Sequence, residues 1–187
     1  MTTISEHKEN LARELTKLDS ANQLKFAAWC CFALTGARSV FDFLSRYSDL
    51  SAPDIHARII KKLDRIWEGS ESGCDCLDFK IQEWNVGEIS MSEDSDAQGA
   101  SDLLAALSFL YEWMRSHYMI DLANCAEQVI NRIDYLEGFG LLPDDVKNPV
   151  DSEIRAQMEF IVDLGSGEVR DSGRVKYHEW LLSLGAP

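Results

Sequence analysis

The chain has 187 residues, of which 45% are hydrophobic and 27% are charged, and its formal net charge at pH 7 is −14. This length and composition are typical of one globular domain and exclude a wholly disordered chain. The negative charge repels the phosphates of nucleic acids and anionic membrane surfaces, so we expect neither nucleic acid nor membrane as a direct partner.

The sequence also suggests a cellular compartment. The N-terminal stretch MTTISEHKENLARELTKL lacks the basic and then apolar layout of a secretory signal, and nothing is typical of a transmembrane segment. The five cysteines do not have the spacing of a disulfide framework. We therefore expect a cytoplasmic protein with reduced thiols.

Apolar residues recur at three- and four-residue steps through most of the first half of the chain. The first such stretch places Ile4, Leu11, Leu15 and Leu18 on one helical face. A later helix should begin at Ser51, because serine is a good N-cap and Pro53 and Asp54 suit a first turn. We expect helices over residues 4–18, 21–35, 40–47, 51–68 and 75–84, followed by an irregular acidic segment, 85–99.

Residues 100–117 form the most apolar stretch of the second half. Leu103, Leu107, Leu110 and Met114 repeat at helical spacing with alanines between them, which predicts a central, buried helix. Further helices are predicted over 122–137, over 149–164 with Ile154, Met158, Ile161 and Leu164 facing inward, and over 172–184. No segment shows strand alternation. Residues 1–187 therefore predict a single all-α domain, a bundle of about seven to eight helices around one central apolar helix.

Four pieces of the sequence carry a resemblance to a known family. They are the stretch from Leu24 to Phe43, Leu63-Asp-Arg-Ile-Trp67-Glu68, the alanine-rich helix at 102–114, and Asn148-Pro149-x-x-x-Glu153-x-x-x-Gln157. In that order they resemble the YjaG-like bacterial proteins, cytoplasmic helical proteins of unknown function (domain of unknown function 416). The chain departs from the family pattern at 36–40, where Gly-Ala-Arg-Ser-Val replaces an expected Pro-x-Tyr. The resemblance implies an all-α fold and no particular activity.

The residue types that usually carry catalysis or bind metal are present but scattered. Cys74 and Cys76 are separated by one residue, whereas structural zinc sites usually need two or more and a second pair. No glutamate is followed three residues later by histidine, as helical di-metal sites require. We therefore expect no catalytic residues, no metal and no cofactor, and we do not expect an enzyme.

The negative charge is concentrated in two blocks. Residues 68–102 contain ten acidic residues and one lysine, and residues 134–171 contain ten acidic and three basic residues. The first block also contains large apolar side chains, and such side chains can anchor an interface whose acids steer a cationic partner. We predict a partner-binding surface made by Asp75, Asp78, Glu83, Trp84, Glu88, Ile89, Met91, Glu93, Asp94 and Asp96. We interpret the second block as exposed faces of amphipathic helices.

These observations favour an acidic binding protein that neutralises a basic protein partner. The most concrete version is an immunity protein that inhibits a bacterial toxin encoded by a neighbouring gene, a nuclease being one candidate. Two alternatives remain: a small helical enzyme or ligand-binding protein with a dispersed site, and an acidic mimic of nucleic acid. The oligomeric state is not predicted.

Overall fold

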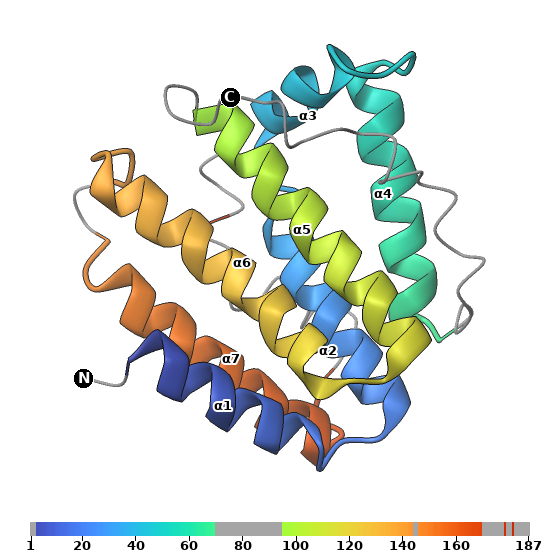
Figure 1. The fold of residues 1–187 in the computed structure, drawn as a ribbon, viewed down its shortest axis with the longest axis vertical. Helices are drawn as coiled ribbons and strands as arrows, with labels where there is room; N and C mark the ends of the chain where they lie inside the picture. Colours follow the sequence, from blue (N-terminus) through green and yellow to red (C-terminus); the bar gives the residue numbers. More distant parts are fainter. Residues whose placement is uncertain (1–2, 70–94, 144–145, 170–177, 179–180, 182–187) are drawn as a thin grey trace.

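The structure, a computed structural model, describes residues 3–69, 95–143, 146–169, 178 and 181. These residues form seven α-helices and no strand, which confirms the predicted all-α single domain (Figure 1). The helices are α1 (Ile4–Leu15), α2 (Ser20–Ala33), α3 (Arg38–Ser45), α4 (Ala52–Trp67), α5 (Ser95–Ser116), α6 (Met119–Gly138) and α7 (Pro149–Ser166).

Local sequence signals determine where several helices begin. Thr3 and Glu6 form a capping box at the start of α1, Asp19 caps α2, and Ser51 caps α4 as predicted. Pro149 occupies the first turn of α7, where its missing N–H is not needed. These caps satisfy backbone donors that would otherwise lack a partner at each helix start.

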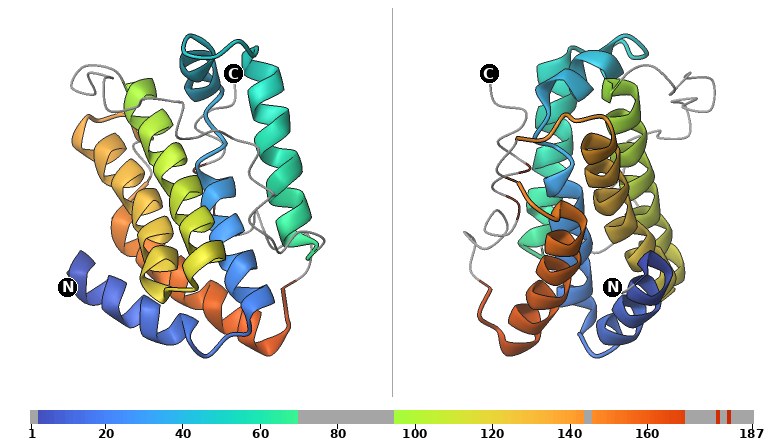
Figure 2. Two further views of the ribbon diagram at one scale, coloured as in Figure 1. Left: turned by 45° about the vertical axis from the view of Figure 1, so that its right-hand side comes forward. Right: turned by 90° about the vertical axis from the view of Figure 1, so that its left-hand side faces the viewer.

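The most enclosed helix is α2, not the 100–117 stretch. Every residue of α2 from Phe26 to its end at Ala33 is buried, so α2 has no solvent-facing side over this span. In Figures 1 and 2 it runs through the middle of the bundle, and it contacts α4, α5, α6 and α7. α5 buries Leu103, Leu107 and Leu110 as predicted but leaves Arg115 exposed at its end.

The prediction of an irregular segment up to residue 99 is wrong at its end, because α5 already begins at Ser95. Small residues make this extension possible. A Cβ atom at Gly99 would lie 2.7 Å from Cγ2 of Val40, so glycine allows α5 to approach α3 closely. The predicted helix 75–84 lies outside the described residues, and only His178 and Leu181 of the predicted helix 172–184 are described.

Three helices meet at one end of the bundle. α1 and α7 lie side by side along one edge, and both contact α6 (Figures 1 and 2). The start of α1, the end of α6 and the start of α7 therefore come together. Among the described residues no single helix is long and apolar enough to cross a membrane. In this part of the chain only α2 and α3 taken together reach the necessary length and apolar composition, and the pair is bent by 85°.

Candidate functional site

The structure describes little of the predicted partner-binding surface. Outside the described residues lie Asp75, Asp78, Glu83, Trp84, Glu88, Ile89, Met91, Glu93 and Asp94. Asp96 lies in the first turn of α5, where its Oδ1 accepts a hydrogen bond from Ser39 Oγ at 2.6 Å. This described member of the surface therefore joins α5 to the start of α3.

The cysteines and histidines of the described residues do not form a metal site. No group of three or more His, Cys, Asp or Glu side chains in this part of the chain could hold a metal ion. Cys30, Cys31 and Cys125 are buried, and the Sγ atoms of Cys31 and Cys125 lie 3.7 Å apart. Burial raises the pKa of the Cys30 thiol, and the contact with Cys125 together with burial raises that of Cys31. Both thiols remain protonated and are poor nucleophiles.

A hollow of about 320 Å³ opens where α1, α6 and α7 meet. Two isoleucines that we predicted to face the core line it instead: Ile4 of α1, which is 38% exposed, and Ile154 of α7. The remaining lining residues are Thr3, Glu137, Asn148, Val150 and Asp151. The hollow thus has an apolar interior with two carboxylates beside it.

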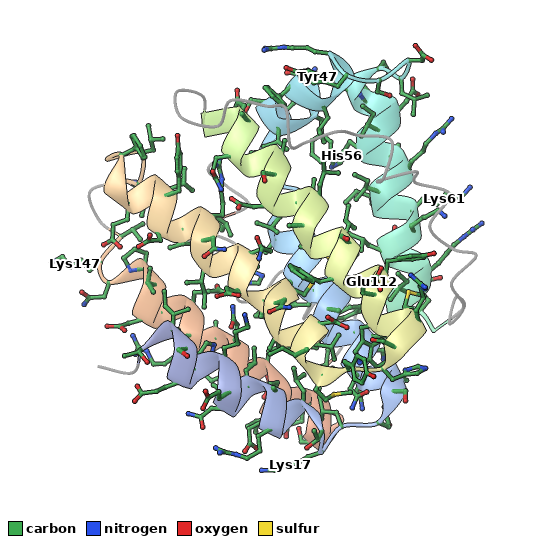
Figure 3. The ribbon with its side chains drawn as sticks, in the orientation of Figure 1. Lys17, Tyr47, His56, Lys61, Glu112 and Lys147 are labelled. Atoms are coloured by element: carbon green, nitrogen blue, oxygen red, sulfur yellow. The ribbon has the colours of Figure 1, made fainter. Side chains whose placement is uncertain are left out.

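The segment that follows α6 contains exposed apolar side chains, close in sequence to a residue that lines the hollow. Phe139 is 63% exposed and Leu141 is 48% exposed, directly after the lining residue Glu137. The exposed Asp134 lies one turn before Glu137 on α6. Lys147 points outward at the left edge of Figure 3, beside the start of α7. We call Ile4, Glu137, Phe139, Val150, Asp151 and Ile154 the end face.

Polar side chains of α1 and α7 are buried in the core, whereas Ile4 and Ile154 of the same helices line the hollow. His7 of α1 is buried, and its Nε2 donates a hydrogen bond to Oε1 of Gln157 on α7 at 2.7 Å. Gln157 Nε2 in turn donates to the carbonyl oxygen of Ala126 on α6 at 3.1 Å and to Glu153 Oε1 at 2.9 Å. One glutamine therefore connects the three helices that line the hollow.

Glu153 is the charged centre of this cluster and is only 1% exposed. His178 Nε2 lies 3.0 Å from Glu153 Oε2 and 3.1 Å from Oε1, and donates to the carboxylate. The His178 ring stacks on Trp29 of α2 with centroids 4.0 Å apart. His178 Nδ1 has no hydrogen-bond partner among the described residues.

An ion pair nearer the surface supports the same arrangement. Lys8 Nζ lies 2.6 Å from Glu127 Oε2, joining α1 to α6, and both side chains are about one-quarter exposed. Such a pair contributes little energy alone. Together with the buried cluster it helps to fix the relative positions of α1 and α6, two of the helices that line the hollow.

Sequence reasoning missed the buried cluster because it assigned acids to the surface. The sequence pattern indicates that Glu153 is a favourable acid in a first helical turn and that Ile154, Met158, Ile161 and Leu164 form the inward face. The structure buries Ile161 and Leu164 as predicted, but earlier in the helix it buries Glu153 and Gln157, whereas Ile154 and Met158 are only half-buried. The four-residue spacing of Glu153 and Gln157, conspicuous in the motif that carries the family resemblance, was the available signal.

Comparisons with known proteins identify no relative of this chain. No protein-family model, no curated protein and no solved structure matches the chain.

Proposed function

We propose that the chain is an acidic binding protein that neutralises a basic protein partner, most concretely an immunity protein that inhibits a bacterial toxin. The observation that carries this proposal is the end face, where apolar side chains are left at the surface beside carboxylates on a chain with a net charge of −14. Exposed apolar groups within a polar rim are characteristic of protein interfaces.

The size of the hollow favours a side chain over a free ligand. Small-molecule pockets commonly measure about 300–1,000 Å³, and 320 Å³ lies at the lower limit. A lysine or arginine can place its apolar stem against Ile4 and Ile154 and its charged head beside Glu137 or Asp151. A basic side chain of a partner protein is thus the occupant that fits both the apolar lining and the carboxylates of the hollow.

The acidic block at 68–102 has a second role in the proposal. Its charge would attract a cationic partner over a distance of about one Debye length, roughly 8 Å at physiological salt. Long-range attraction raises the association rate, whereas apolar anchors slow dissociation. The predicted surface from Asp75 to Asp96 would therefore act together with the end face, or replace it as the main contact.

Surface plasmon resonance against the basic protein encoded beside this gene tests the proposal. We expect Phe139→Ser to speed dissociation, and the pair Glu137→Gln and Asp151→Asn to slow association and flatten its salt dependence. Two matched controls come from exposed positions of α7 that do not line the hollow, Val162→Ser and Glu159→Gln.

The controls decide how the result is interpreted. If the variants and controls all bind like the parent, the interface lies elsewhere and the end face is not the site. If the parent itself does not bind the neighbouring protein and does not protect cells that express it, the proposed function is wrong. A ligand-binding protein then becomes the leading alternative, and a second pocket favours it.

A further inference from the structure

A second pocket lies away from the end face, between the turn that joins α2 to α3 and the start of α4. It has a volume of about 440 Å³ and is lined by Thr35, Gly36, Arg38, Phe41, Ala52, Pro53 and His56. In Figure 3, His56 lies on the upper half of α4, near α3. This volume is within the range of small-molecule sites.

The pocket wall is apolar and partly aromatic. Phe41 is buried, and the His56 ring meets it edge-on with centroids 4.7 Å apart. Pro53 and Ala52 supply the remaining apolar lining. A flat apolar body fits such a wall better than a strongly hydrated ion, because aromatic rings favour offset or edge-to-face contact with one another.

The nitrogen-bearing side chains of the pocket, Arg38 and His56, can donate hydrogen bonds, whereas the Thr35 hydroxyl already donates to the Phe32 carbonyl. No carboxylate lines the pocket among the described residues. Within this part of the chain, Arg38 makes no hydrogen bond or ion pair, and its guanidinium is exposed at the first position of α3. Desolvation lowers the pKa of His56 below its ordinary value of 6.5. At neutral pH His56 therefore offers one N–H donor, and Arg38 offers the positive charge.

Two further features suit an anion. Ala37, the N-cap of α3, provides no side-chain acceptor for the first turn of that helix, whose N-terminal end is partially positive. The pocket also lies in the part of the chain where bases are not outnumbered: residues 1–67 contain ten lysines and arginines and eight acidic residues. The excess of acidic residues therefore lies in other parts of the sequence, and of these acids Asp96 accepts a hydrogen bond from Ser39 in the first turn of α3 without lining the pocket.

We propose that this pocket binds a small aromatic carboxylate, with its ring against Phe41 and Pro53 and its carboxylate on Arg38 and His56. The site is independent of the end face and does not rest on the proposed function. A carboxylate fits the forked guanidinium of Arg38 through two parallel hydrogen bonds.

Benzoate is the probe, and its neutral isostere benzamide is the ligand control. We expect benzoate to shift the amide resonances of Thr35, Gly36 and Ala52 in a saturable way in a two-dimensional NMR titration, with benzamide at least tenfold weaker. Arg38→Ala should weaken benzoate binding at least tenfold. His56→Phe, which keeps an aromatic ring in contact with Phe41 but removes the N–H, should weaken it several-fold.

Arg58→Ala is the matched protein control, because Arg58 is an exposed arginine on α4 that does not line the pocket. Each variant is first shown to retain the helical circular dichroism and melting temperature of the parent. The proposal is overturned if benzoate gives no saturable shift up to about 10 mM, a concentration that would still reveal binding of only a few kcal/mol. It is also overturned if benzamide binds equally well, or if Arg38→Ala and Arg58→Ala have the same effect.

Discussion

Asp102 on α5 gives the sharpest quantitative prediction, because burial of its carboxyl in the folded protein shifts its pKa strongly. Burial raises this pKa from 3.8 to about 6, although the hydrogen bond from Gln98 and the charge of Arg132 oppose the rise. Gln98 Nε2 donates to Asp102 Oδ1 at 2.9 Å, whereas Oδ2 has no partner among the described residues. Ionised Asp102 is therefore poorly solvated in the folded state.

The sign of the pH effect follows from these two values. The folded carboxyl holds its proton up to about pH 6, whereas the unfolded one loses it near 3.8, so rising pH favours the unfolded state across this window. Linkage gives a destabilisation of about 3 kcal/mol at pH 8 and about half of that at pH 5. Asp102→Asn cannot ionise and keeps an acceptor for Gln98, so it should lack this pH-dependent loss.

Urea unfolding followed by circular dichroism measures the difference in free energy of unfolding between parent and Asp102→Asn at pH 5 and at pH 8. The asparagine amide can itself cost stability at both pH values, but that cost cancels when the two differences are compared. We expect Asp102→Asn to gain about 1–2 kcal/mol relative to the parent on going from pH 5 to pH 8. Asp134→Asn, at an exposed position of α6, is the control and should show no such gain. Parallel pH profiles for the parent and Asp102→Asn would refute the reasoning.

Two further predictions concern the core. Leu107→Ala should lower the free energy of unfolding by about 2–5 kcal/mol, because Leu107 is 2% exposed and its removal leaves a cavity between helices; a loss below about 0.5 kcal/mol in urea melts would contradict the observed packing of α5. Glu153→Ala should cost about 1–3 kcal/mol for each buried donor left unsatisfied, since His178 Nε2 and one N–H of Gln157 lose their acceptor. Glu153→Gln retains an acceptor and should cost less, and equal losses for the two variants in thermal and urea melts would contradict the hydrogen-bonding role.

The fold could be predicted from the sequence because its signals are local. Ser51 followed by Pro53 specifies a helix start through backbone geometry, and the leucines of α5 repeat at a spacing that only a helix can bury on one face. The extension of α5 to Ser95 was missed, because it depends on Gly99 meeting Val40, a contact between residues far apart in the chain.

The candidate site could not be predicted for a related reason. Hydrophobic periodicity places isoleucines inside and acids outside, whereas here Ile4 and Ile154 line a surface hollow and Glu153 lies in the core. The burial of Glu153 depends on His178, which is distant from Glu153 in sequence. His178 supplies a hydrogen-bond donor that makes the buried glutamate tolerable. A single amphipathic helix contains no information about such a partner.

The measurement that tests the central claim most directly is a methyl NMR titration of the labelled protein with the proposed partner, the protein encoded beside its gene. Val150 and Ile154 line the hollow, and Val162 on the same helix is 67% exposed without lining it. We predict that the methyl resonances of Ile4, Val150 and Ile154 shift or broaden on binding while those of Val162 do not. Binding that perturbs Val162 and leaves the hollow unchanged, or no binding at all, would contradict the account.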